Sequence, residues 1–349
     1  MLLAALRDLQ WRRHRFIVAV LGAALVFAMG LLMSGLSNAF VVEVDRTLDQ
    51  TGGDHWVAPA GAAGPFSAGV AIPLDAMPDD LAARAGVRRA DPLLFSRAVG
   101  EVNGTVLDVN LFGVVPGGLG SPRPSHGRGP DGAGEILVAS SVGDIGDEVT
   151  IFGTVFEVVG TVEHASLIGG TPSVFVPLDG AQQLVANGLD VASMIVTDGQ
   201  PADLPPGLRA FDRADVQEDL ARPLRNATRS IDFVRVLLWM VAALIVGSVV
   251  YLSALERTRD FAVFKASGVR TSAIGLGLTL QAVAIALTAS VVGAVLAVVI
   301  APAFPLDVVI SRSSLLLLPL VAIVSGALAS LVGLRRVATV QPAAAFGGP

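Results

Sequence analysis

The chain of 349 residues has no cysteine, which excludes disulfide bonds, thiolate metal sites and lipid-modified cysteines. Charge is also scarce, because Asp, Glu, Lys and Arg make up 15% of the chain, whereas soluble domains carry about 25%. Aromatic residues amount to 5%, while 53% of the residues are hydrophobic and 38 are glycine. This composition predicts membrane helices that pack closely through small residues. The net charge of −6 argues against a nucleic-acid partner.

Motifs for ATP binding and for common hydrolytic chemistry are also missing. A P-loop needs a Gly-Lys pair, and the only lysine, Lys265, follows Phe264. There is no Gly-x-Ser-x-Gly motif, and the four histidines are too far apart for a zinc motif: His14, His55, His126 and His164. We therefore predict that the chain is not an enzyme and has no catalytic, cofactor-binding or metal site. Any ATP must be bound by another chain.

Four apolar runs approach or exceed the roughly 20 residues that a membrane-spanning helix needs. They cover residues 16–40, 233–255, 273–301 and 314–334. The first run follows a basic segment and could instead be a cleaved signal peptide, with Ser37-Asn38-Ala39 as the small-residue cleavage site. Signal-peptide cores are shorter, at about 7–15 residues, so we favour an uncleaved membrane anchor.

The distribution of arginine and lysine predicts the orientation of these helices. Arg12, Arg13 and Arg15 precede the first run, and Arg335 and Arg336 follow the last. The positive-inside rule then predicts a multi-pass protein of the cell membrane with both termini in the cytoplasm. An amphipathic N-terminal segment (1–15), a loop (256–272) and a tail (335–349) would be cytoplasmic, while residues 41–232 and a short loop (302–313) would lie outside.

One group of residues opposes this orientation, since four arginines lie on the outer side of the second run: Arg222, Arg225, Arg229 and Arg235. Long domains are translocated largely regardless of their charge, so we keep the predicted topology.

The interval 41–232 is long enough for one or two compact domains. Alternating apolar residues around 149–159 predict a hairpin with its turn at Gly153-Thr154. A strand then enters a helix that Asp179 is placed to cap. Helical segments at both ends of the interval, the second kinked near Pro223, predict two stalks that continue into membrane helices. The fold class is an α+β membrane protein with one N-terminal and three C-terminal transmembrane helices, and with a mixed α/β extracytoplasmic domain between the first and second.

The predicted membrane helices carry no ionisable residue at their centres, where ion-coupled carriers usually place one. Their main polar groups are hydroxyls and one amide: Thr279, Gln281, Thr288, Ser325 and Ser330. We interpret these side chains as interhelical hydrogen-bonding groups. A polar path through the membrane is not evident, which weakens a carrier or channel function.

A charged segment, residues 256–270, interrupts the apolar sequence between the second and third runs. It predicts a short amphipathic helix in which Phe261 and Phe264 share a face, Gly268 ends the helix in a left-handed turn, and Thr271 or Ser272 caps the next helix. Two interpretations remain open. The helix is either a basic segment that lies at the anionic inner leaflet or a docking element with the two phenylalanines as its anchor.

This segment resembles a cytoplasmic signature of the MacB/FtsX-type ABC transporter permeases, roughly Glu-Arg-x-Arg-Glu-Phe/Ile-Ala-Val-Leu-Lys-Ala-Leu/Ile-Gly-Ala. Nine positions match: Glu256, Arg257, Arg259, Phe261, Ala262, Val263, Lys265, Ala266 and Gly268. Asp260, Phe264, Ser267 and Val269 depart from it modestly. Three further stretches, WRRHRFIVAVLGAALV, VGDIGDEVTIFGTVFEVVGTV and RRVATVQPAAAF, are similar to the family's first helix, outer domain and C-terminus. The single four-helix unit is most similar to the DevC-like branch.

The resemblance implies a mechanotransmitting permease that works as a homodimer or heterodimer in membrane lipid, for export or extrusion of a substrate. A separate cytoplasmic ABC ATPase would bind ATP and Mg²⁺, and an extracytoplasmic adaptor would be a further partner. The implied ATPase-docking residues form the coupling helix: Glu256, Arg257, Arg259, Asp260, Phe261, Phe264, Lys265 and Gly268. Two alternatives are an FtsX-like signalling subunit that regulates a cell-wall hydrolase, and a receptor or scaffold without an ATPase.

Overall fold

The computed structural model describes residues 13–69, 72–75, 77–304 and 308–339. Predictions that concern residues 1–12 and 340–349, among them most of the amphipathic N-terminal segment and the end of the C-terminal motif, lie outside the described residues. The chain divides into two units. We call Met1–Ala39 with Ala227–Pro349 the helical unit, and Phe40–Asn226 the inserted domain.

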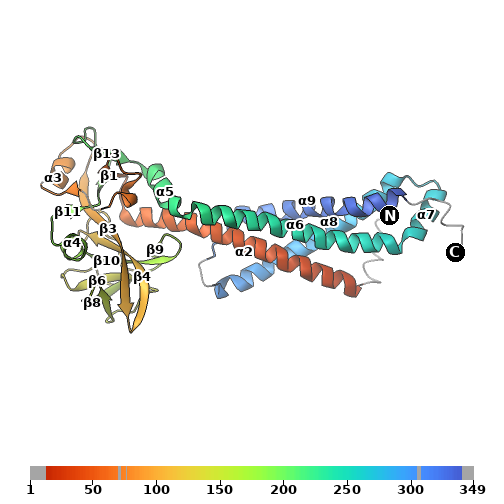
Figure 1. Cartoon of the computed structure of the whole chain (residues 1–349), viewed down its shortest axis with the longest axis horizontal. Coiled ribbons are helices and arrows are strands. Elements are labelled where there is room, and N and C mark those ends of the chain that lie inside the picture. Colours follow the sequence, from red (N-terminus) through yellow and green to blue (C-terminus); the bar gives the residue numbers. More distant parts are fainter. Residues whose placement is uncertain (1–12, 70–71, 76, 305–307, 340–349) are drawn as a thin grey trace. The chain divides into compact units, whose positions relative to one another are not determined.

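Four long helices and one short helix make up the described part of the helical unit (Figure 1). They are α2 (Arg13–Thr51), α6 (Arg225–Glu256), α7 (Thr258–Ala266), α8 (Thr271–Ile300) and α9 (Arg312–Thr339), with a 3₁₀ turn, η3 (Ala301–Ala303), after α8. Within the described residues, α2, α6, α8 and α9 are long and apolar enough to cross a membrane, which confirms the predicted arrangement of one helix, a domain and three helices. Both α2 and α6 extend beyond the predicted apolar runs, because helix-forming residues continue into the inserted domain.

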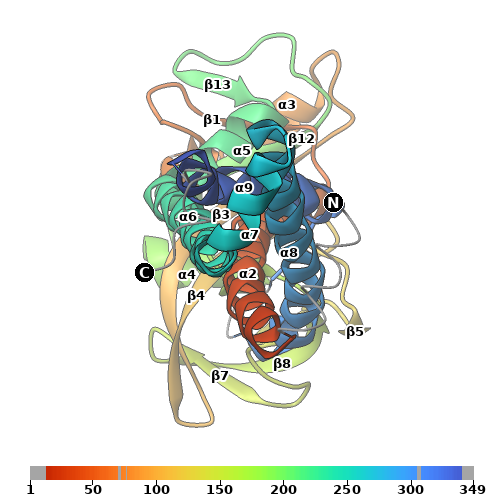
Figure 2. The ribbon, with the colours of Figure 1, turned by 90° about the vertical axis from the view of Figure 1, so that its right-hand side faces the viewer.

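The long helices of this unit lie side by side (Figures 1 and 2), and small residues allow their backbones to approach closely. A Cβ atom added at Gly293 of α8 would lie 2.7 Å from the carbonyl oxygen of Ala24 on α2. A Cβ atom at Gly326 of α9 would lie 2.8 Å from the Cα atom of Val283 on α8. Real Cβ atoms are not found at such distances, so both glycines permit backbone approach that any other residue would prevent.

Six strands of the inserted domain close into a barrel. They are β3 (Arg89–Val102), β4 (Thr105–Val114), β10 (Thr171–Pro177), β6 (Glu135–Ala139), β8 (Thr154–Val162) and β7 (Glu148–Ile151), and β7 pairs back to β3. The β4–β10 and β6–β8 pairs are parallel, whereas the other four pairs are antiparallel. Closure leaves these strands without free edges, and their alternate residues point inward.

The sheet continues from β3 through β12 (Met194–Asp198), β1 (His55–Pro59) and β13 (Leu208–Phe211). The remaining short elements are β2 (Ile72–Pro73), β5 (His126–Gly127), β9 (Ser166–Leu167), β11 (Val191–Ala192), α3 (Met77–Ala82), α4 (Leu178–Ala186), α5 (Arg213–Ala221), η1 (Pro65–Ser67) and η2 (Arg222–Leu224). The 3₁₀ turn η2 contains Pro223, which confirms the predicted kink before α6. The N-cap of α4 is Pro177 and no side chain caps it, so the prediction that Asp179 caps this helix is wrong.

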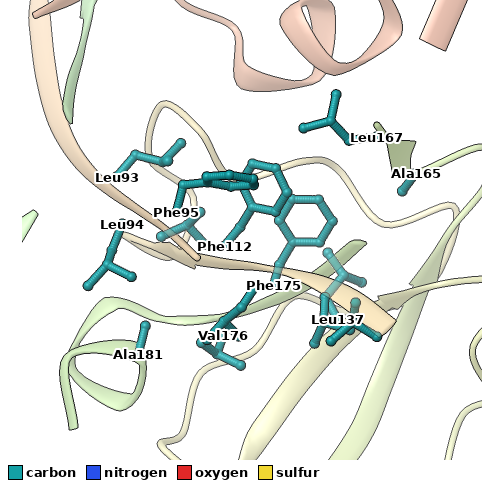
Figure 3. Close-up of a cluster of buried hydrophobic side chains, with 14 of the residues drawn as sticks. Leu93, Leu94, Phe95, Phe112, Leu137, Ala165, Leu167, Phe175, Val176 and Ala181 are labelled. Atoms are coloured by element: carbon teal, nitrogen blue, oxygen red, sulfur yellow. The ribbon is translucent and has the colours of Figure 1, made fainter. Parts of the chain in front are cut away.

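Aromatic rings fill the core of the inserted domain (Figure 3). Phe95 and Phe112 meet edge to face at a centroid separation of 5.2 Å, and Phe112 stacks on Phe175 at 5.0 Å. Leu93 and Leu137 lie next to them, whereas Leu94 points to the other side of β3, towards Ala181. The three aromatic side chains come from β3, β4 and β10, which are successive strands of the barrel. Their contacts therefore fix the mutual register of these strands.

Both hairpins of the barrel turn through two residues with positive φ. The predicted hairpin at 149–159 is confirmed, but its turn is Phe152-Gly153 rather than Gly153-Thr154, because Ile151 pairs with Thr154. The β3–β4 hairpin turns at Asn103-Gly104. Such turns favour Asn and Gly, so the Asn-Gly pair could have predicted this second hairpin.

Candidate functional site

The short helix α7 follows α6 after a single residue and ends in a left-handed cap. Gly268 has a φ of 88°, its N–H donates to the carbonyl oxygen of Lys265 at 3.1 Å, and the N–H of Val269 donates to that of Phe264 at 2.9 Å. These two bonds form a Schellman motif, and the predicted role of Gly268 is confirmed. The N-cap of α8 is Arg270 without a side-chain bond, so the prediction that Thr271 or Ser272 caps it is wrong.

One side of α7 is packed into the helical unit. Phe261 is 5% exposed and, with Ala262, is buried against the other helices, while Phe264 is half-buried against the same cluster. The Phe261 ring therefore packs against the chain's own helices, and Phe264 beside it stays partly exposed. The packing of the helix decides this orientation, and the docking role of the two rings stays a prediction.

The other side of α7 is exposed and mixes charge with an apolar centre. Arg259, Asp260, Val263 and Ala266 are all exposed, and Val263 is 51% exposed. Positions 259, 263 and 266 follow helical spacing and share one face, which we call the α7 outer face. Sequence reasoning missed Val263, although its four-residue spacing from Arg259 was a usable signal.

The other residues of the predicted site flank the α7 outer face. Glu256 and Gly268 are exposed, and Arg257 and Lys265 are half-buried. The guanidinium of Arg257 lies 3.8 Å from the carboxylate of Asp260, in the first turn of α7. The segment is thus a capped helix with one side fixed and the other presenting both signs of charge.

A polar network lies in the N-terminal part of α6. Arg235 pairs with Asp232 at 2.9 Å, donates to the hydroxyl of Ser34 on α2 at 3.1 Å and covers the ring of Trp239. The amide of Asn38 donates to the carbonyl oxygen of Val309, which fixes the segment before α9 to α2. Asp232 therefore neutralises the charge of Arg235, and Ser34 accepts one of its hydrogen bonds. These contacts account for a cation at this position.

The polar groups of the long helices are used in different ways. Thr279 on α8 bonds to Ser330 on α9 at 3.0 Å, which confirms the interhelical role predicted for both. Thr288 instead donates to the carbonyl oxygen of Ala284 on its own helix, so that prediction is wrong for Thr288. Among the described residues, the buried Nε2 atom of Gln281 has no hydrogen-bond partner.

Within the inserted domain, the last part of α2 is held at two places. The carboxylate of Glu43, which is 7% exposed, accepts hydrogen bonds from the N–H groups of Gly169 at 3.0 Å and Gly170 at 2.8 Å. On another side, Arg213 of α5 pairs with Asp49 at 2.8 Å and with Asp45 at 3.3 Å. Residues 40–51 of α2 are therefore attached to both the β9–β10 turn and α5.

Charge is segregated between the two units. The inserted domain contains 25 of the 30 acidic residues but only 11 of the 24 basic ones, which gives it a net charge of −14. The remaining residues of the chain, by the same count, carry +8. The net charge of −6 for the whole chain is the sum of these two opposite values.

Comparison with known proteins matches two family models to the two regions. The MacB-like periplasmic core domain matches residues 17–205, and the FtsX-like permease C-terminal matches residues 233–342. An uncharacterized ABC transporter permease of Mycobacterium tuberculosis strain H37Rv is 47% identical over 350 residues, and a second from the same strain is 46% identical. Both alignments cover 100% of each chain. This chain belongs to the MacB/FtsX-type ABC transporter permeases.

Two solved domains are similar to the inserted domain of this permease at low identity. The periplasmic region of MacB from Actinobacillus actinomycetemcomitans is 11% identical, with a TM-score of 0.37, over 48% of this chain and 92% of that one. The extracellular domain of the noncanonic ABC-type transporter YknZ from Gram-positive bacteria is 13% identical, with a TM-score of 0.35, over 46% of this chain and 99% of that one. The family assignment rests on the sequence matches over the whole chain.

Proposed function

We propose that this permease couples ATP hydrolysis by a separate cytoplasmic ATPase to motion of the inserted domain, for export or extrusion of a substrate. The sequence has no P-loop, which supports placing ATP and Mg²⁺ on the partner. The inserted domain then lies outside the cell membrane and both termini lie in the cytoplasm, in agreement with the basic residues that flank the first and last apolar runs.

The α7 outer face is the observation that carries this proposal. A docking helix must transmit force, so it must be fixed to its own unit and still present contacts to a partner. The burial of Phe261 and Ala262 supplies the attachment, and Arg259, Val263 and Ala266 supply the contacts. An apolar centre with a polar rim is the usual anatomy of a protein–protein interface, and arginine is enriched among the residues that contribute most to binding.

Helix continuity supports the mechanical part of the proposal. Because α2 is a single helix whose last turns are attached by Glu43 and by Asp45 and Asp49, displacement of α2 would be passed to the β9–β10 turn and α5. A permease dimer would present two such helices to two ATPase subunits.

The test is co-purification of the ATPase with the full-length permease. Val263→Asp and Arg259→Glu, both on the α7 outer face, should each reduce the bound ATPase about ten-fold or more while the permease remains folded and inserted. Ser272→Asp adds the same charge at an exposed position in the first turn of α8 and serves as the matched control. ATPase binding by Val263→Asp that equals binding by the control would contradict docking at this face.

A further inference from the structure

Four strands of the barrel present an exposed face that mixes apolar and acidic side chains. Near the two hairpin turns, along residues 97–102 of β3, 106–109 of β4, 148–151 of β7 and 155–158 of β8, residues that are more buried alternate with residues that are more exposed. The exposed apolar residues are Val99, Val106 and Val155, with Phe152 at the turn of the β7–β8 hairpin. We call this surface the acidic barrel face, because its other exposed residues include one cation, Arg97, and four carboxylates: Glu101, Asp108, Glu148 and Glu157.

Strand register makes this face continuous. Val106 lies opposite Glu101, Glu101 lies opposite Thr150, and Thr150 lies opposite Val155. Directly opposed residues share a face, with Cβ atoms about 5 Å apart, so these four side chains form one row across β4, β3, β7 and β8. Val106 at 66% and Val155 at 53% exposure give the row apolar ends.

Two features of the acidic barrel face are unfavourable for the isolated fold. Phe152 has a φ of 50°, a left-handed conformation that is a strained outlier for a bulky residue, and its ring is 55% exposed. The equivalent position of the β3–β4 hairpin holds Asn103, which suits that conformation. In addition, Glu148 lies directly opposite Glu157 across β7 and β8, and like charges in this position are destabilising. Arg128, which pairs with Asp131 and Glu135, lies close enough to Glu157 to offset part of this repulsion.

The exposure of Phe152 and the opposition of Glu148 and Glu157 both become more favourable when a cationic apolar partner covers the face. A partner would remove the Phe152 ring from water and neutralise the opposed carboxylates. A second copy of the chain would bring a domain of net charge −14 against another of the same sign, and an anionic lipid surface would be repelled in the same way.

We propose that the acidic barrel face binds a polypeptide segment in which lysine or arginine alternates with apolar side chains. Phe152 supplies the apolar anchor, while Glu101, Glu148 and Glu157 pair with the cations. This site is separate from the α7 outer face and does not depend on the ATPase-docking proposal.

The test uses the full chain in nanodiscs of zwitterionic lipid and a fluorescent peptide of alternating lysine and valine. Fluorescence anisotropy should show binding that weakens with added salt, and no binding of the matching glutamate–valine peptide. Phe152→Asn should weaken binding about ten-fold or more without lowering thermal stability, because asparagine fits the turn better than phenylalanine. Leu189→Asn, at an exposed apolar residue elsewhere on the inserted domain, should leave binding unchanged.

Three results would overturn the proposal. The first is equal binding of the lysine–valine peptide by Phe152→Asn and the unaltered chain. The second is a concentration-dependent self-association that Phe152→Asn abolishes, which would assign the face to a second copy. The third is stronger binding to vesicles containing anionic lipid than to the peptide, with the same dependence on Phe152.

Discussion

The attachment of α2 to the inserted domain predicts a large effect from one buried carboxylate. Glu43 is 7% exposed and accepts two backbone hydrogen bonds from Gly169 and Gly170. Both donors lie in a turn where Ile168, Gly169 and Gly170 all have positive φ, so their N–H groups converge on the carboxylate. Replacement of Glu43 by alanine removes the acceptor of both N–H groups in a region that water reaches poorly.

The size of this effect follows from the hydrogen bonds that are lost. A hydrogen bond to a charged group contributes about 1.5–3 kcal/mol, and a buried donor left unsatisfied costs about 1–3 kcal/mol. We therefore expect Glu43→Ala to destabilise the inserted domain by about 2–5 kcal/mol, which for a domain of this size corresponds to a decrease in Tm of roughly 5–15 °C. The control is Asp49→Ala, because Asp49 and its partner Arg213 are 69% and 44% exposed, and such a pair contributes only about 0–1 kcal/mol.

The assay is unfolding of the full chain followed by the fluorescence of Trp56. This residue is fully buried in the inserted domain, and phenylalanine at Trp11 and Trp239 leaves it as the only tryptophan signal. Glu43→Gln should also destabilise the domain, because the NH₂ group of the side-chain amide would face one of the two backbone N–H donors. A Tm for Glu43→Ala that matches that of Asp49→Ala would refute the attachment argument.

Two further predictions concern acid sensitivity and helix packing. The hydrogen bond from Arg128, with help from the N–H of Asp131, lowers the pKa of Glu135 to about 2, so its contribution to stability is present above its unfolded pKa of about 4.3 and is lost as the pH falls towards 2. The difference in Tm between the unaltered chain and Glu135→Gln should therefore shrink across this pH window, and a constant difference would contradict the pairing. On α8, Gly293→Leu should reduce the monodisperse folded fraction in detergent by overpacking against α2, whereas Gly277→Leu, where an added Cβ meets nothing within 4 Å, should not.

The helices could be predicted from sequence because a membrane-spanning helix depends on a local property, the length of an apolar run. The approximate position of α7 and its left-handed cap at Gly268 were also readable, since glycine is favoured where φ is positive. The turn of the β7–β8 hairpin was placed one residue too late, because phenylalanine is disfavoured at the position it occupies. Local preference gave no reason to expect Phe152 there.

Closure of the barrel could not be predicted from sequence, because it depends on the pairing of β3 with β7, strands separated by nearly fifty residues. The orientation of α7 could not be predicted from the sequence either. Two phenylalanines three residues apart indicate a shared apolar face, but they do not indicate whether that face meets a partner or the chain's own helices. Packing against the helical unit decides this, and it buries Phe261 while leaving Val263 exposed.

The central claim, that ATP hydrolysis by an ATPase docked at the α7 outer face moves the inserted domain, can be tested by one distance measurement. Because the chain has no cysteine, Leu189→Cys in the inserted domain and Leu316→Cys on α9 would carry the only two spin labels. Both residues are exposed. With the ATPase bound, the label-to-label distance distribution should shift between the nucleotide-free and ATP-trapped states. The shift should be absent in Val263→Asp. An unchanged distribution while the complex hydrolyses ATP would contradict the account.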